Sequence, residues 1–187
     1  IALLPGSRKQ ELEACLPIML QVDFSQFADY QFIVAGTDAL PCTLYHTLMK
    51  GSNAKIVYGK TYDLLQHAEA AIVTSGTATL ETALFNVPQV VCYEAFLSRL
   101  VAPFLRMVLK IKYVSLVNII AQKELVKELL IQDFTPKNTQ KELQKLVFDQ
   151  AYRANILAGY QQLHTELGTT IASDTAAKAM VNYLKKE

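Results

Sequence analysis

Short apolar runs alternate with amphipathic stretches along the first two thirds of the chain. The apolar runs predict strands at Ile1–Leu4, Gln31–Ala35, Lys55–Tyr58, Ala71–Thr74 and Gln89–Cys92. Helix-period stretches follow them at Lys9–Leu20, Leu40–Lys50, Tyr62–His67, Ala78–Phe85 and Phe96–Leu109. Apolar strands that alternate with helices are typical of a parallel sheet with right-handed crossovers. The pattern therefore predicts an α/β fold, a Rossmann-like parallel sheet with helices on both faces.

The pattern changes after Asn118, where the remainder of the chain is predicted to be helical only. The helices are expected at Gln122–Ile131, Gln140–Phe148, Ala151–Leu167 and Thr175–Lys185. We therefore expect a Rossmann-like core at residues 1–121 and a helical C-terminal extension at residues 122–187 that packs on this core. The apolar run at Ile1 has no methionine before it and meets a turn at once, which indicates that the chain is a fragment.

Composition narrows the class of protein. The 187 residues are 51% hydrophobic and 19% charged, which is typical of a folded globular domain. A net charge of +1, without a basic stripe that carries aromatic residues, argues against nucleic-acid binding. The sequence starts without a signal peptide and has no apolar run long enough to span a bilayer. Cys15, Cys42 and Cys92 lie far apart among apolar residues, which predicts buried thiols in a reducing compartment.

The first predicted strand leads into a loop, Pro5-Gly6-Ser7-Arg8, that suits an anion. Gly6 allows a ligand to approach the backbone closely, and Ser7 with Gln10 forms a capping box at a helix start. Arg8 then falls in the first helical turn, where the helix dipole favours anions over cations. Either a bound phosphate explains this arginine, or it is a surface residue in a tight turn.

A second strand-to-helix loop is rich in small and hydroxyl-bearing residues. Gly76 and Ala78 leave backbone N–H groups uncovered at a helix N-terminus, which is a favourable place for a diphosphate. Glu81 lies one turn into the helix, where its carboxylate could accept hydrogen bonds from a ribose diol. The alternative is that the carboxylate only interacts favourably with the positive end of the helix dipole. We prefer the ligand site over an ordinary capped turn because of the hydroxyl groups of Ser75, Thr77 and Thr79.

The third loop, Tyr58-Gly59-Lys60-Thr61, is not a P-loop, because Ala54 stands where the first glycine of that motif belongs. It can still contact a base through its backbone, with Thr61 capping the next helix. His46, His67 and His164 are scattered and lack the spacing of metal ligands, so we expect no metal site and no cofactor.

The stretch Phe96–Lys110 combines apolar residues with three cations on one helical face. Two alternatives are about equally consistent with it, a core or subunit-interface helix and an amphipathic helix at a membrane surface. The second alternative assigns lipid contact to Arg99, Phe104, Arg106 and Lys110, with Pro103 kinking the helix.

Several of these strings together resemble lipid-A-disaccharide synthases. The resemblance rests on Leu3–Arg8 with Gln10 and Glu11, on Ser75–Glu81, on Ser115–Ala121, and on Glu128–Gln132 with Thr135 and Pro136. It covers essentially the whole chain but only the C-terminal half of such an enzyme. Val117 and Lys127 stand where the family usually has proline, and Glu94 stands where lysine is common. These departures concern the loop near Asn118 and the charge near the phosphates, and they leave the two main loops unchanged.

The resemblance implies one half of a two-domain GT-B glycosyltransferase that inverts configuration. Such an enzyme moves 2,3-diacylglucosamine from UDP onto 2,3-diacylglucosamine 1-phosphate without a required metal, at the cytoplasmic face of the inner membrane of Gram-negative bacteria. The C-terminal half holds UDP, to which we also assign Asn118, and Arg8 stabilises the charge of the departing UDP. The implied partners are the UDP-diacylglucosamine donor, a lipid acceptor, the N-terminal acceptor domain with its catalytic carboxylate, the inner-membrane surface and a second subunit in a homodimer.

Two other functions remain open from the sequence. One is another enzyme of this fold that uses UDP-N-acetylglucosamine, such as a 2-epimerase or a lipid II synthase. The other is a nucleotide-sugar binding module without activity.

Overall fold

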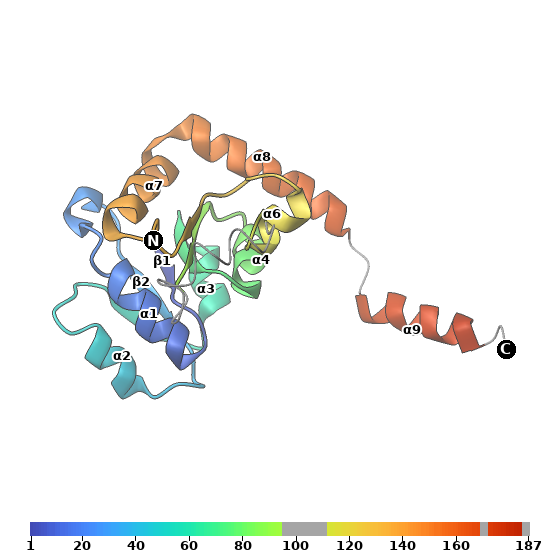
Figure 1. Cartoon of the computed structure of the whole chain (residues 1–187), viewed down its shortest axis with the longest axis horizontal. Helices are drawn as coiled ribbons and strands as arrows, with labels where there is room; N and C mark the ends of the chain where they lie inside the picture. Colours follow the sequence, from blue (N-terminus) through green and yellow to red (C-terminus); the bar gives the residue numbers. More distant parts are fainter. Residues whose placement is uncertain (95–111, 169–171, 185–187) are drawn as a thin grey trace.

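The computed structural model describes residues 1–94, 112–168 and 172–184. Its centre is a sheet of six parallel strands in the order β3-β2-β1-β4-β5-β6 (Figure 1). The strands are β1 (Ala2–Leu4), β2 (Ile33–Gly36), β3 (Lys55–Tyr58), β4 (Ala71–Thr74), β5 (Gln89–Tyr93) and β6 (Glu128–Leu130). The five predicted strands are therefore present, and the predicted Rossmann-like α/β fold is confirmed.

The strand order places β1 beside β4 at the centre of the sheet. Leu4 of β1 is in register with Val73 of β4, so the loops that follow these two strands leave the same edge side by side. The chain builds outward from β1 to β3 and then returns to build outward from β4 to β6. Ligands of open α/β sheets bind at such a switch point, outside the carboxyl ends of the strands.

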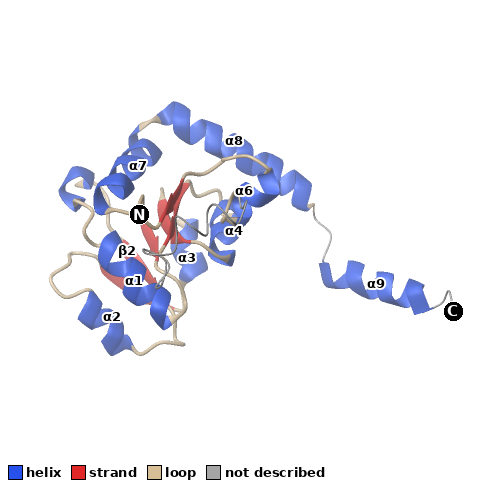
Figure 2. Ribbon diagram, viewed as in Figure 1, coloured by secondary structure: helices blue, strands red, loops and turns tan. Residues whose placement is uncertain are grey.

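The helices lie on both faces of this sheet (Figure 2). Successive strand residues point to opposite faces, so Leu3 packs in one buried cluster while Ala2 and Leu4 pack in another. The first cluster includes Leu12 and Leu16 of α1, whereas the second is covered mainly by α3. The helices described are α1 (Lys9–Met19), α2 (Cys42–Leu48), α3 (Thr61–Gln66), α4 (Thr77–Leu84), α6 (Leu116–Ala121), α7 (Pro136–Phe148), α8 (Gln150–Leu167), α9 (Ala172–Leu184) and the 3-10 turn η1 (Phe24–Phe27).

The predicted helix Gln122–Ile131 is wrong. The short helix α6 ends instead at Gln122, which adopts a left-handed conformation, and residues 128–130 form β6. Leu129 pairs with Cys92 of β5 and is buried. Pairing with the edge of β5 and burial in the apolar cluster therefore outweigh the local helix propensity of residues 128–130. The sheet therefore continues past residue 121, and the region 122–187 is not helical only.

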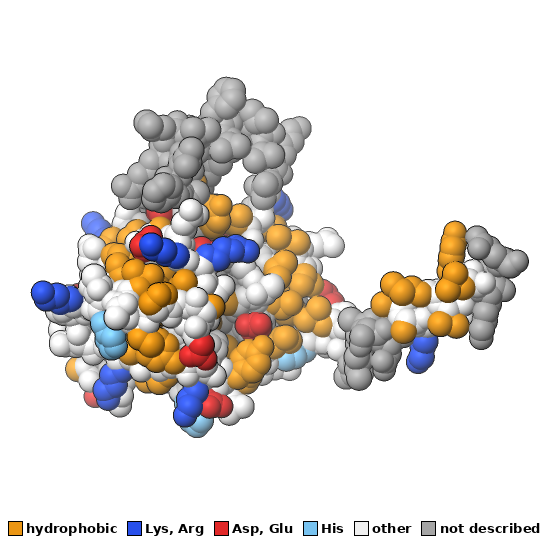
Figure 3. Space-filling view, turned by 90° about the horizontal axis from the view of Figure 1, so that it is seen from below, with side chains coloured by type: hydrophobic (Ala, Val, Ile, Leu, Met, Phe, Trp, Pro, Cys, Tyr) orange, Lys and Arg blue, Asp and Glu red, His pale blue; other side chains and the backbone are white. Residues whose placement is uncertain are grey.

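The C-terminal helices differ in how they meet the core. α7 contacts α1, β4 and β5, and α8 contacts α4, α6 and α7. α9 stands apart from this body in Figure 1, and hydrophobic side chains lie on its surface in Figure 3. Its exposed hydrophobic residues are Met180, Val181, Tyr183 and Leu184. The predicted packing on the core is therefore seen for α7 and α8.

The predicted basic helix Phe96–Leu109, and with it Arg99, Phe104, Arg106 and Lys110, lies outside the described residues. Among the residues that the structure does describe, no helix combines the length and the apolar character that crossing a membrane requires.

The three cysteines do not share one environment, which corrects the expectation of three buried thiols. Cys15 and Cys92 are buried, and desolvation raises the pKa of both thiols because it disfavours the thiolate. Cys42 is exposed at the start of α2. We expect a thiol reagent at about pH 8 to modify Cys42 in the folded protein and the other two only after unfolding. Mass spectrometry that finds two or more modified cysteines under native conditions would contradict this burial.

Candidate functional site

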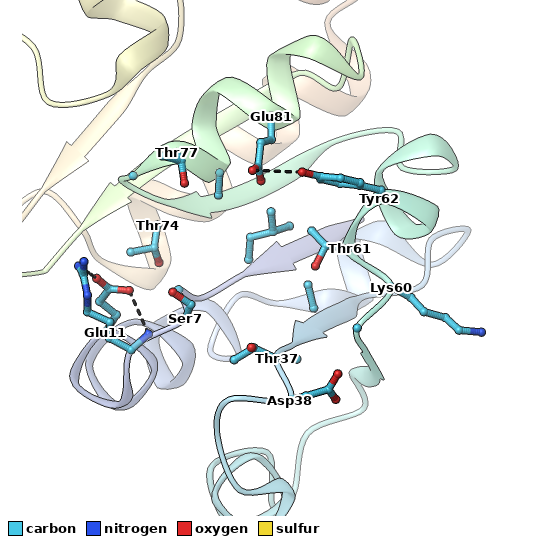
Figure 4. Close-up of a pocket in the computed structure, with 18 of the residues that line it drawn as sticks. Ser7, Glu11, Thr37, Asp38, Lys60, Thr61, Tyr62, Thr74, Thr77 and Glu81 are labelled. Atoms are coloured by element: carbon cyan, nitrogen blue, oxygen red, sulfur yellow. Dashed lines mark hydrogen bonds and ion pairs between the residues drawn. The ribbon is translucent and has the colours of Figure 1, made fainter. Parts of the chain in front are cut away.

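A pocket of about 880 Å³ opens at the carboxyl ends of β1, β2, β3 and β4 (Figure 4). The loops that follow these four strands line it, so residues far apart in the sequence meet there. Nine of the residues predicted to bind the ligand line this one pocket: Gly6, Ser7, Arg8, Gly59, Ser75, Gly76, Thr77, Ala78 and Glu81. The placement of β1 beside β4 explains why the two main predicted loops come together.

The β1–α1 loop forms one end of the pocket. The helix begins at Lys9, as its hydrophobic pattern predicted, but its N-cap is Arg8 and its third helical residue is Glu11, not Gln10. Glu11 Oε2 accepts a hydrogen bond from the Arg8 backbone N–H at 3.3 Å, and Glu11 Oε1 accepts one from Arg8 Nη1 at 2.8 Å. The predicted capping box of Ser7 and Gln10 is therefore wrong, because Glu11 has the reach and position to cap the Arg8 N–H.

Gly6 is required where it stands. Its φ of +98° lies in the left-handed region, and a β-carbon there would come 2.5 Å from Glu11 Oε2. The loop thus bends sharply between β1 and α1 and keeps the start of α1 close to the pocket. The side chain of Arg8 is 82% exposed, so the Arg8–Glu11 ion pair is largely solvated.

The β4–α4 loop forms the adjoining wall. Gly76 is the N-cap of α4 with φ 156° and ψ −162°, a conformation that only glycine adopts readily. Its carbonyl accepts hydrogen bonds from the backbone N–H and the hydroxyl of Thr79. The first N–H groups of α4, which begin at Thr77, have no partner within the helix and carry the positive end of its dipole. This loop can therefore hold an anion.

Ser75 connects this wall to two other segments. Its backbone N–H donates to the carbonyl of Cys92 at 2.8 Å, and its hydroxyl donates to the carbonyl of Val114 at 3.1 Å. The position of the loop is therefore fixed by β5 and by the segment that leads into α6. The Ser75 hydroxyl is thus engaged by the protein itself.

Glu81 and Tyr62 lie at the other end of the pocket, where Figure 4 shows their side chains facing one another. The Tyr62 hydroxyl donates to Glu81 Oε1 at 3.3 Å, and the nearby carboxylate is the main cause of the raised pKa of Tyr62. Tyr62 is 54% exposed, and its ring lies 5.3 Å from the ring of Phe85. The pocket is therefore long, with the Arg8–Glu11 pair at one end and the Tyr62–Glu81 pair at the other.

Two of the predicted ligand residues face away from the pocket. Tyr58 lies in β3 with its ring 5.5 Å from that of Tyr45 in an edge-to-face contact. Thr79 is fully buried in α4, and its hydroxyl bonds to Gly76. Neither side chain lines the pocket, because strand alternation and helix periodicity turn them toward the interior.

Asn118 is also absent from the pocket lining, and its side chain is occupied in the interior. Its Oδ1 accepts hydrogen bonds from the backbone N–H groups of Leu125 and Val126, at 2.8 and 2.9 Å. Its Nδ2 donates to the Val126 carbonyl and to Glu128, both at 2.8 Å. In this structure Asn118 therefore fixes the turn between α6 and β6, where the sequence predicted a contact with UDP.

The pocket also contains polar residues that the sequence did not single out as ligand contacts. They share a position at the end of a strand, just after it or in the next helical turn: Glu11, Thr37, Asp38, Lys60, Asp63 and Thr74. Thr37 and Asp38 directly follow β2, so the rule that ligands lie at strand ends was a signal that could have found them. Within the described parts of the chain, no group of three His, Cys, Asp or Glu residues is arranged to hold a metal ion.

Comparison with known protein families gives a match that covers nearly the whole chain. Residues 1–182 match the family described as lipid-A-disaccharide synthetase. A lipid-A-disaccharide synthase of Syntrophus aciditrophicus is 34% identical, over 100% of this chain and 50% of the relative. One from Gloeothece citriformis is 35% identical, over 98% of this chain and 49% of the relative. The chain thus spans about half the length of the curated relatives it matches.

Solved structures share the fold. The glycosyltransferase SnogD from Streptomyces nogalater superposes with a TM-score of 0.56 at 19% identity, over 96% of this chain and 42% of SnogD. The glycotransferase of kitacinnamycin gives a TM-score of 0.50 at 15% identity, again over 42% of its length. The Rossmann-like half of a GT-B fold is therefore shared with glycosyltransferases. Together with the match over residues 1–182, which includes both pocket loops, this establishes that the chain belongs to the lipid-A-disaccharide synthetase family.

Proposed function

We propose that this chain is the UDP-binding half of a lipid-A-disaccharide synthase, which moves 2,3-diacylglucosamine from UDP to 2,3-diacylglucosamine 1-phosphate. The observation that carries the proposal is the meeting of two helix N-terminal loops, Gly6–Arg8 and Ser75–Ala78, in one pocket at the β1–β4 switch point. Helix N-termini attract phosphate groups through free N–H groups and the helix dipole. Membership of the family supports the nature of the sugar donor.

The arrangement of the residues that line the pocket suggests how UDP lies in it. The diphosphate would bind between the N-termini of α1 and α4, the ribose diol would face Glu81, and the uracil would extend toward Gly59–Thr61. Glycosyl transfer leaves negative charge on the departing UDP, and fixed N–H donors together with Arg8 would stabilise it. We therefore propose that the reaction needs no metal ion.

The rest of the reaction would depend on parts that this chain does not supply. We propose an acceptor domain that contributes the catalytic carboxylate and binds the lipid acceptor. We further propose that the enzyme works at the cytoplasmic face of the inner membrane, with Arg99, Phe104, Arg106 and Lys110 in contact with lipid. Transferase activity of the longer protein, but not of this chain alone, would distinguish this function from that of a non-catalytic binding module.

Replacing Arg8 with alanine is expected to weaken UDP binding about three- to tenfold, because a single exposed charge contributes on the order of 1 kcal/mol. Isothermal titration calorimetry at low salt measures this change. Lys9→Ala is the matched control, since Lys9 is the next residue along the chain and does not line the pocket. Equal loss of affinity in both variants would show that net charge, not the placement of Arg8, accounts for the effect.

A further inference from the structure

Glu11 occupies the place that an anion would take at the start of α1. One carboxylate oxygen accepts the Arg8 backbone N–H at 3.3 Å, and the other lies 2.8 Å from Arg8 Nη1. Glu11 also lies against Gly6, where a β-carbon would come within 2.5 Å of its Oε2. Glu11 thus engages the backbone N–H and one guanidinium nitrogen of Arg8, the residue that the proposed function assigns to a phosphate. The dashed lines at Glu11 in Figure 4 mark these two contacts.

A phosphate that enters this end of the pocket must either displace the Glu11 carboxylate or lie beside it. Displacement breaks an ion pair and a helix cap, whereas close approach brings two negative charges together. Both costs lower the affinity for an anion, and the second grows with the charge of the phosphate. The side chain of Glu11 is only 27% exposed, so solvent screens it less than the Arg8 side chain.

The direction of the bound nucleotide decides which phosphate meets Glu11. Glu81 and Tyr62 lie at the far end of the pocket and suit the nucleoside, so the terminal phosphate faces the Gly6–Glu11 end. In a UDP-sugar this phosphate is bonded to both the α-phosphate and the sugar and carries one negative charge. In free UDP it is bonded to the α-phosphate alone, and its second proton is lost with a pKa of about 6, so UDP carries more negative charge there at about pH 8.

We propose that Glu11 is a specificity-determining residue that selects against UDP relative to the UDP-sugar. It weakens the binding of the more highly charged product more than that of the donor, and so favours the release of UDP after transfer. The proposal rests on the proposed function for the identity of the nucleotide. The competition between Glu11 and a phosphate rests on the contacts of Glu11 alone.

The test compares wild-type chain, Glu11→Gln and Glu13→Gln by calorimetry at about pH 8 and low salt, with UDP and UDP-N-acetylglucosamine as probes. Glutamine removes the charge but can still accept the Arg8 N–H. We expect Glu11→Gln to bind UDP about three- to tenfold more tightly and UDP-N-acetylglucosamine less than about threefold more tightly. Glu13 is exposed on the same helix and pairs with Lys9, so Glu13→Gln controls for net charge and should change either affinity by less than about twofold.

Three results of these titrations would overturn the proposed role of Glu11 or the proposed function. Weaker UDP binding by Glu11→Gln would overturn the proposal and show that the carboxylate holds Arg8 in a productive position. Equal effects on both ligands, or none, would also overturn it. If none of the proteins binds UDP, the proposed function fails, and inorganic pyrophosphate then tests Glu11 by itself. Tighter pyrophosphate binding by Glu11→Gln would support the competition, and unchanged or absent binding would overturn it.

Discussion

Replacing Gly76 with alanine is expected to weaken UDP binding by about 10- to 100-fold. The backbone of Gly76 has φ 156° and ψ −162°, which costs a residue with a β-carbon about 1–3 kcal/mol. An added β-carbon would meet no atom within 4 Å, so the effect comes from rotation of the backbone and not from a clash. Rotation would turn the first N–H groups of α4 away from the ligand, and each hydrogen bond to a charged group is worth about 1.5–3 kcal/mol.

Calorimetry with UDP measures this loss, and circular dichroism confirms that the variant is folded. Gly51→Ala is the matched control, because Gly51 also has a positive φ, of 82°, and also has nothing within 4 Å of the added β-carbon. Gly51 does not line the pocket, so its substitution should strain the loop without changing UDP affinity. UDP affinity that is unchanged in a folded Gly76→Ala protein would show that the α4 N-terminus does not hold the diphosphate.

Replacing Asn118 with alanine is expected to lower the free energy of unfolding by about 2–4 kcal/mol. The substitution leaves the backbone N–H groups of Leu125 and Val126 without their buried acceptor, and removes the donor to Glu128. An unsatisfied buried polar group costs about 1–3 kcal/mol. Glu128 also accepts hydrogen bonds from Ser115 N and Oγ, so Asn118 is one of two residues that connect α6 and its N-cap to β6 through Glu128. Loss of Asn118 therefore weakens this connection.

Urea unfolding of the variant measures the stability, and UDP titration of the folded protein measures the affinity. Asn138→Ala removes one exposed side-chain hydrogen bond, to the Asp133 carbonyl, and should cost less than about 1 kcal/mol. The assignment of Asn118 to the interior would be contradicted by a variant that is as stable as the wild type but loses UDP binding. That result would restore the contact with UDP that the sequence predicted.

The sequence was sufficient for most of the sheet because the central strands are apolar on both faces. Lys55–Tyr58 and Ala71–Thr74 were both predicted with the observed bounds, although only the second is a fully buried central strand and the first is a half-buried edge strand. β6 could not be predicted in this way. It has three residues, and only its pairing with β5 makes it a strand. Pairing of this kind depends on which edge is free in the folded chain, and local sequence does not carry that information.

The parts of the candidate site that were predicted correctly are those whose residue types by themselves indicate a helix N-terminus. Small and hydroxyl residues at the start of a helix, as at Ser75–Ala78, indicate N–H groups that have no partner within the helix. Glu11 was not predicted as the capping residue because Gln10 has the expected spacing from Ser7, and only the observed N-cap, Arg8, makes Glu11 the third helical residue. Asn118 was assigned through a family resemblance, and the hydrogen bonds that bury its side chain come from residues later in the chain.

The most direct test of the shared pocket is a UDP titration of isotope-labelled chain followed by amide NMR. The account predicts that the backbone amides of Gly6, Ser7 and Arg8 and those of Gly76 and Thr77 shift together, with one dissociation constant. Both loops would then report the same bound diphosphate at the junction of β1 and β4. Shifts confined to one loop, or different dissociation constants for the two, would contradict it.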